Sequence, residues 1–149
     1  FSPSGRYVYG ISSTYTEIPQ INHPTIYDRT TKEVTLFGNM GYVSAMTDDG
    51  VVFLNDSPYG WGTTVFVVDT AKGGEPTEWE SLEDWIKREY NIDLAKFEPS
   101  TDTEPDTTYE LDGSIIVGTS ADGRKLLGIT STMNGYVNFV IDLDGVPAE

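Results

Sequence analysis

Residues 120–130 of this 149-residue chain read SADGRKLLGIT, and a similar phrase opens the chain at residues 2–12 as SPSGRYVYGIS. A weaker copy, TDDGVVFLN, lies between them at residues 47–55. Each copy has a polar turn that ends in Gly, which tolerates positive φ, and then a short apolar run typical of a β-strand. Repetition at intervals of tens of residues is typical of modular folds, in which each unit buries its apolar face on its neighbours.

A second signal follows each phrase at a regular distance. An apolar strand ending in Asp is completed 23 residues after the turn Gly in the first copy and 19 residues after it in the others, at residues 25–28, 66–69 and 139–142. Because the two signals stay in step, we expect each unit to be a meander of antiparallel strands. Gly10 and Gly128 close two of the apolar runs, where glycine indicates a close backbone approach or a bulge.

One segment departs from the strand pattern. Residues 81–84 form a capping-box sequence, SLED, and the apolar residues that follow share one helical face: Leu82, Trp85, Ile86 and Tyr90. This predicts a helix at about residues 82–90, anchored to the sheet by Trp85. We place the units of a single domain at about residues 1–44, 45–118 and 119–149, with a helical insertion at 78–96.

The composition excludes several kinds of partner. With 24 acidic and 9 basic residues, the net charge of −15 would repel nucleic acid and anionic membranes. The absence of cysteine excludes disulfides and thiolate metal sites. No apolar run approaches the roughly 20 residues needed to cross a bilayer, so we expect no membrane insertion. The chain opens at Phe1, inside a repeat, and we expect it to belong to a longer product.

The phrases resemble those of the bacterial extracellular propeller-like repeat family, whose repeats are called HAF or WD40-like. The family phrase is Ser-x-Asp-Gly-x-x-x-x-Gly, followed by a strand with an aromatic residue. Residues 120–128 match it, residues 2–10 match it with Ser4 at the Asp position, and residues 47–55 depart from it with Asn55 at the final Gly. The resemblance covers about half of the chain, in three pieces. It implies an all-β fold: antiparallel meander blades of a partial β-propeller, with the helix inserted. It implies no shared catalytic residues.

The number of units leaves three architectures open. Propellers usually have about four to eight blades, and this chain holds two complete units and part of a third. It is either a fragment of a larger propeller, or one of several copies that assemble, or a small domain of open sheets with exposed edges. The first two alternatives require further blades or other copies of the chain to close the fold.

Candidate catalytic groups are scarce. His23 is the only histidine, so a multi-histidine metal site is excluded, and no Gly-x-Ser-x-Gly phrase indicates a serine nucleophile. Alternating acids at residues 102–106 and 142–144 suit calcium, but they do not continue as an EF-hand, and we interpret them as a solvated loop and a hairpin turn. We therefore predict no catalytic residue, metal or cofactor. The many carboxylates leave a glycosidase-like pair as an open alternative.

Aromatic residues give the best indication of binding. Tyr59 and Trp61 lie in a glycine-flanked loop between two predicted strands, and Tyr15 and Tyr136 occupy comparable loops of the other units. Such rings stack on sugars or on partner side chains. We predict these four residues as a ligand-binding set at one end of the sheets; the alternative is that the rings pack between blades.

Two functional hypotheses follow. The first is a non-catalytic scaffold or binding module of a secreted or surface bacterial protein, extracellular or periplasmic, with a protein or glycan as its ligand. The alternative is a carboxylate-dependent hydrolase with its site on the propeller face. A pocket of converging carboxylates with raised pKa would favour the enzyme, whereas an exposed aromatic face would favour binding.

Overall fold

The computed structural model describes residues 1–14, 21–38, 41–56, 64–73, 75, 78–92, 114–132 and 135–144. Ten strands, one α-helix and one short 3-10 helix are found in this part of the chain. The strands are β1 (Tyr7–Thr14), β2 (Ile21–Asp28), β3 (Val34–Leu36), β4 (Tyr42–Met46), β5 (Val51–Asn55), β6 (Val65–Asp69), β7 (Glu80–Ser81), β8 (Ser114–Thr119), β9 (Lys125–Thr132) and β10 (Gly135–Asp142). The 3-10 helix η1 spans Thr70–Lys72, and α1 spans Leu82–Tyr90.

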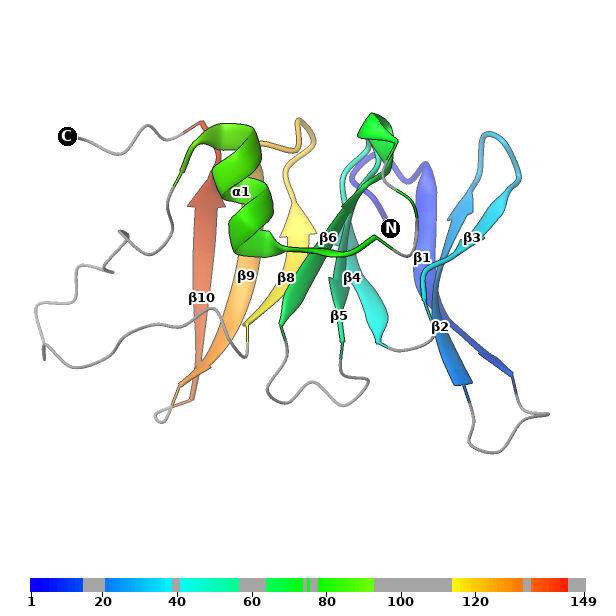
Figure 1. Cartoon of the computed structure of the whole chain (residues 1–149), viewed down its shortest axis with the longest axis horizontal. Coiled ribbons are helices and arrows are strands. Elements are labelled where there is room, and N and C mark those ends of the chain that lie inside the picture. The colour runs from blue at the N-terminus through cyan, green and yellow to red at the C-terminus, as the bar shows by residue number, and fades with distance from the viewer. Residues whose placement is uncertain are drawn as a thin grey trace, which may run out of the picture.

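The strands form three antiparallel sheets, with the orders β1-β2-β3, β4-β5-β6-β7 and β10-β9-β8. The sheets follow one another along the long axis of the molecule, and α1 lies beside the second and third (Figure 1). The prediction of a mostly-β fold of antiparallel meanders with one helix is confirmed, and the helix has the predicted bounds. No sheet closes on itself within the described ranges. The second and third sheets begin at β4 and β8, before the residues at which the sequence repeats begin.

The repeated phrase builds the same turn three times. The hydroxyl groups of Ser2, Thr47 and Ser120 accept hydrogen bonds from the backbone N–H groups at the start of the following strands, at 3.2, 2.9 and 2.9 Å. The turn glycines all have positive φ, between +70° and +105°, as the sequence predicted. These side chains are used locally, because each satisfies a backbone donor that the turn would leave unpaired.

The trailing aspartates cap the turn that follows the second strand of each hairpin, at the same end of the sheet as the repeat turn. Asp28 and Asp142 accept hydrogen bonds from the N–H groups two residues later, at 2.7 and 3.1 Å, and Asp69 accepts one from Lys72 at 3.2 Å. In the registers, Asp28, Asp69 and Asp142 pair with Tyr7, Val51 and Lys125, the first residues of their partner strands. The spacing seen in the sequence is therefore the length of a hairpin, from the start of its first strand to the end of its second.

The second sheet is buried on both faces. One face packs against the first sheet in a cluster that includes Val52, Leu54 and Val68. The other face packs against the third sheet and α1 in a cluster that includes Phe53 and Trp85, whose rings meet edge to face with centroids 5.8 Å apart. Trp85 is 2% exposed, which confirms that it anchors the helix to the sheet.

Helix α1 begins and ends where its sequence requires. Ser81 is the N-cap, and its hydroxyl accepts a hydrogen bond from the N–H of Asp84 at 3.1 Å. Asn91, with φ of +55°, ends the helix in the left-handed conformation and donates its N–H to Lys87 O at 3.0 Å. The predicted apolar face is buried at Leu82, Trp85 and Ile86, so the helix depends on the sheet for its stability.

Candidate functional site

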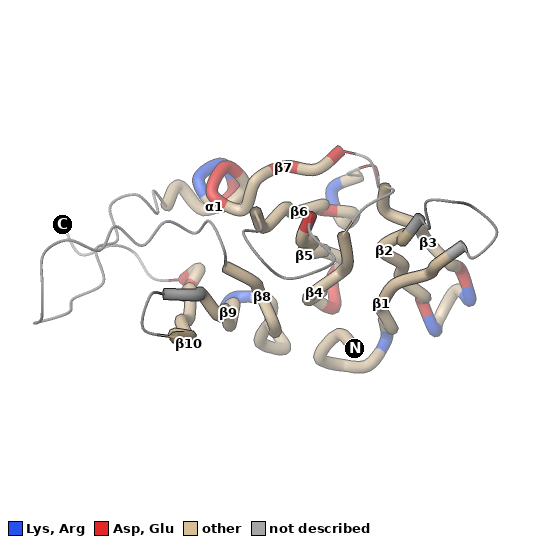
Figure 2. The backbone as a smooth tube through the Cα atoms, turned by 90° about the horizontal axis from the view of Figure 1, so that it is seen from below, with Lys and Arg blue, Asp and Glu red and all other residues tan. Residues whose placement is uncertain are grey.

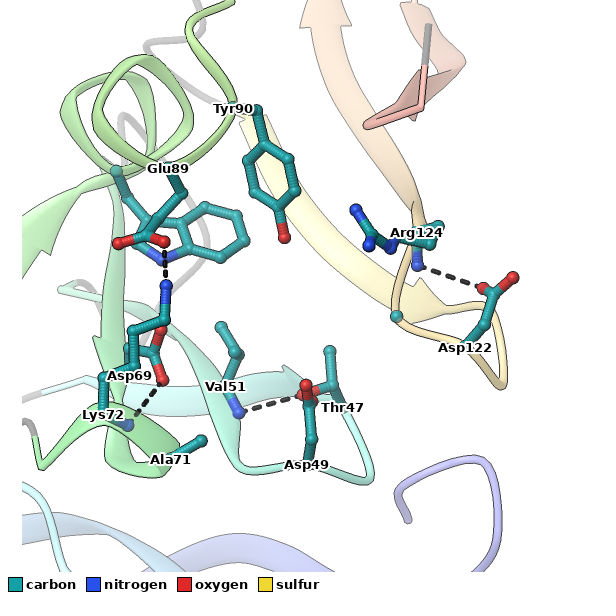
Figure 3. Close-up of a pocket in the computed structure, with 12 residues that line it drawn as sticks. Thr47, Asp49, Val51, Asp69, Ala71, Lys72, Glu89, Tyr90, Asp122 and Arg124 are labelled. Atoms are coloured by element: carbon teal, nitrogen blue, oxygen red, sulfur yellow. Dashed lines mark hydrogen bonds and ion pairs between the residues drawn. The ribbon is translucent and has the colours of Figure 1, made fainter.

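A cleft of about 440 Å³ lies between the second and third sheets at their turn ends, under the last turn of α1. Its walls come from four segments: the β4–β5 turn, η1 with the end of β6, the β8–β9 turn and α1 (Figure 3). The repeat turns therefore supply two of the four walls, and helix α1 of the insertion supplies another. Only the tertiary structure brings these segments together, since they span residues 47–124.

Opposite charges alternate around the cleft. Lys72 forms an ion pair with Glu89, and the guanidinium of Arg124 lies 5.9 Å from the centroid of the Tyr90 ring. Burial raises the pKa of Tyr90, while Arg124 partly opposes that rise. Figure 3 shows Tyr90 and Arg124 facing Lys72 across the opening. The cleft thus presents charged groups of both signs together with hydroxyl groups, and such a lining suits a polar ligand better than an apolar one.

The three aspartates of the cleft serve the turns. Asp49 accepts a hydrogen bond from the Thr47 hydroxyl, and Asp69 accepts one from the N–H of Lys72. The hydroxyl of Ser120 donates to Asp122 Oδ1 at 2.5 Å and is the largest cause of the lowered pKa of Asp122. A carboxylate with a lowered pKa stays ionised at neutral pH and is a poor general acid.

Two other carboxyl groups have pKa values below the ordinary range. The hydrogen bond from Arg6 lowers the pKa of Asp28 to about 2. Burial would raise the pKa of Asp48, but hydrogen bonds from Ser2 and Ser4 outweigh it and lower the pKa. Asp48 accepts from Ser4 N at 2.9 Å and from Ser4 Oγ at 2.6 Å, and so links the first turn to the second. The hydrogen bonds that cause these shifts stabilise the turns. A glycosidase acid requires a raised pKa, and both of these pKa values are lowered.

One polar atom beside the cleft lacks a partner within the described part of the chain. The indole Nε1 of Trp85 is buried and makes no hydrogen bond to a described residue, although Trp85 lines the cleft. A buried unpaired N–H costs about 1–3 kcal/mol. The same ring packs against both Phe53 and Tyr90, so its position is fixed by apolar contacts.

Only one of the four predicted ligand-binding residues lies within the described part of the chain. Tyr136 is the second residue of β10, opposite Ser131, and its side chain is 73% exposed. Tyr15, Tyr59 and Trp61 lie outside the described residues. The strand ends that flank the three connections, at β1–β2, β5–β6 and β9–β10, lie on the side of the molecule away from the repeat turns (Figure 1).

The third sheet has an exposed apolar face that was not predicted from the sequence. Leu127 and Val140 are directly opposite each other in β9 and β10 and are 45% and 61% exposed. Val117 of β8 and Tyr136 are further exposed apolar residues of this sheet. The signal was the adjacent pair Leu126 and Leu127, because a strand that is apolar on both faces is typical of a sheet covered on both sides.

The described residues contain no group of three or more His, Asp or Glu side chains placed to hold a metal ion. Nor does any helix among them have the length and apolarity needed to span a membrane. No protein-family model matches the chain, and no match was found among curated proteins or solved structures.

Proposed function

We propose that this chain is a non-catalytic, propeller-like binding module of a secreted or surface bacterial protein, with a protein or glycan as its ligand. Three antiparallel sheets that follow one another along the chain support this proposal. The second sheet has four strands in the order β4-β5-β6-β7. The first sheet has counterparts of its last three strands, in the order β1-β2-β3, and the third sheet has counterparts of its first three, in the order β8-β9-β10. The first strands β4 and β8 pack against each other, as the innermost strands of neighbouring blades do.

The observation that carries this proposal is the use of the repeated polar residues. Ser2, Thr47 and Ser120 bind backbone N–H groups, and the trailing aspartates cap the following turns. These groups hold hairpins in place and do not converge on a reacting centre. Repetition of structural side chains is typical of a scaffold, whose ligands are bound by exposed loops and faces.

The carboxylate-dependent hydrolase is supported less well. A glycosidase needs one protonated carboxyl group at neutral pH, and burial without compensation is the usual way to obtain it. The pKa values of Asp28, Asp48 and Asp122 all move in the opposite direction. Exposed Tyr136, in contrast, offers a ring for stacking next to the β9–β10 connection.

Affinity electrophoresis in gels that contain soluble xylan, mannan or β-glucan tests the glycan ligand. We expect at least one polysaccharide to retard the protein, and Tyr136→Ala or Trp61→Ala to reduce the retardation. Phe1→Ala is the matched control, because Phe1 is 74% exposed and precedes the first repeat turn. Equal mobility in every gel would refute glycan binding, and release of reducing sugar by the purified protein would favour the hydrolase.

A further inference from the structure

Each sheet uses its two faces in the same way. Two residues before each capping Asp, a cross-strand pair lies on the forward face: Tyr9 with Ile26, Phe53 with Val67, and Leu127 with Val140. The first pair packs in the cluster shared by the first and second sheets. The second pair packs in the cluster shared by the second and third sheets. The forward face of one sheet therefore contacts the next sheet along the chain.

The pair one residue closer to the Asp lies on the backward face: Val8 with Tyr27, Val52 with Val68, and Leu126 with Ile141. Val52 and Val68 pack toward the first sheet. Leu126 and Ile141 pack toward the second sheet. In both sheet-to-sheet contacts within the chain, a forward face therefore packs against a backward face, and α1 also takes part in the second of them.

The third sheet also has a forward face, and no described residue of the chain covers it. Phe53 and Val67 are 0% and 1% exposed, whereas the equivalent Leu127 and Val140 are 45% and 61% exposed. Strands β8, β9 and β10 carry charged residues only at strand ends, so the middle of this face is uncharged (Figure 2). An apolar face of this kind is typical of an interaction surface.

The first sheet has the complementary backward face. Val34 pairs with Tyr27 and Leu36 pairs with Thr25, so these β3 residues share the face of Val8. Val34 and Leu36 are 61% and 48% exposed. The first and third sheets lie at opposite ends of the molecule, so their two outer faces point away from each other (Figure 1).

We infer that the forward face of the third sheet binds the backward face of the first sheet of a second copy of this chain. This inference rests on the proposed repeat module, because it extends the same sheet-to-sheet contact from within the chain to a contact between chains. A contact of unlike faces is heterologous, so it joins copies head to tail and generates a ring where the rotation closes. The partner is a second copy because, among the described residues, the backward face of its first sheet is exposed at Val34 and Leu36.

Charge opposes this association and predicts its salt dependence. Each copy has a net charge of −15, so two copies repel each other at low ionic strength. The proposed contact is apolar and does not depend on ion pairs. We therefore expect association to strengthen as salt is added, since screening removes the repulsion and leaves the apolar contact.

Sedimentation velocity tests the inference with two variants, Val140→Glu and Val34→Glu. In about 0.5 M salt, which screens exposed charges, we expect the wild type to sediment as species heavier than the 16.4 kDa monomer. Each variant blocks one of the two faces with a charge, so each alone should associate at least about 100-fold more weakly. Ala121→Glu, which adds the same charge to an exposed residue of the β8–β9 turn, is the control and should associate as the wild type does.

A mixture of the two variants gives the decisive result. Val34→Glu keeps an intact third sheet and Val140→Glu keeps an intact first sheet, so the mixture should form a one-to-one pair and nothing larger. Leu127→Lys and Leu36→Lys provide a second such pair of variants where circular dichroism shows that a glutamate variant has unfolded. A wild type that stays monomeric would overturn the inference, as would a mixture that fails to pair. Association retained by Val34→Glu alone would indicate a symmetric contact between two third sheets and would also overturn it.

The two proposals fail separately. A monomeric wild type that is still retarded by a polysaccharide would remove the head-to-tail contact and leave the binding module. Head-to-tail pairing with no retardation in any gel would remove the glycan ligand and leave the contact between copies.

Discussion

Replacement of Gly128 by alanine should destabilise the protein, whereas the same replacement at the equivalent Gly10 should not. A Cβ at Gly128 would lie 2.1 Å from Cζ of Phe139, the residue opposite it in β10. A Cβ at Gly10 would have no atom within 4 Å. Neither glycine has positive φ, so the backbone itself accepts alanine at both positions.

The expected sizes follow from two opposing effects. Forcing a methyl group into a packed site costs about 1–3 kcal/mol, and Gly→Ala at a compatible position stabilises by about 0.4–1 kcal/mol through the unfolded chain. Gly128→Ala should therefore lower the free energy of unfolding by about 1–2 kcal/mol. Gly10→Ala should raise it by about 0.5 kcal/mol.

Urea denaturation, monitored by tryptophan fluorescence, measures the free energy of unfolding of both variants. A double variant tests whether the contact with Phe139 causes the loss at Gly128. Phe139→Leu shortens the side chain that the new methyl group would meet, so Gly128→Ala should cost less in the Phe139→Leu background than in the wild type. Equal stability of Gly128→Ala and wild type would refute the close contact. Equal destabilisation at Gly10 and Gly128 would show that strand propensity rather than packing decides both.

Three further predictions concern the helix and a capped turn. Trp85→Ala should lower the free energy of unfolding by about 3–5 kcal/mol in urea denaturation, because it empties a fully buried site of the core; a loss below 1 kcal/mol would contradict that burial. Ser81→Ala should cost about 1 kcal/mol by removing the N-cap of α1, and Ser81→Asp should restore most of that loss in the same assay. The pKa of Asp28 is lowered to about 2 in the folded protein, so its contribution to stability is present above the unfolded pKa near 4 and is lost as the pH falls toward 2. Urea midpoints measured between pH 5 and pH 2 should therefore fall less steeply for Asp28→Asn than for the wild type, and parallel curves would contradict the ion pair with Arg6.

Much of the fold could be predicted because the signals that define it are local. The turn phrase acts within six residues: Ser120 binds the backbone of Lys125, and Gly123 adopts the positive φ that the turn needs. Helix α1 has its predicted bounds because Ser81 and Asn91 satisfy its ends with their own side chain and backbone. Interactions between residues close in sequence form in the same way whatever surrounds them.

The candidate site was harder to predict because it depends on how the sheets stack. The cleft joins the β4–β5 turn to the β8–β9 turn, and the sequence identifies both as copies of one phrase without showing that they lie side by side. Tyr136 was predicted to lie in a loop and instead belongs to strand β10, where it is exposed, and the apolar face around Leu127 was not predicted. Periodicity shows that a strand is apolar on both faces without showing which neighbour covers each of them.

Gly10 and Gly128 illustrate where the sequence by itself stops. Both close the apolar run of the same repeated phrase, and the sequence indicated a close backbone approach or a bulge at each. The Phe139 ring lies against the backbone of Gly128, whereas at Gly10 the space is open and the register of β1 with β2 is unbroken. The sequence alone determined the turns, the strands and the helix, since these depend on hydrogen bonds and conformational preferences within a few residues. The tertiary structure alone decided which sheet faces are buried and which are left open, because burial depends on the position of a sheet in the stack.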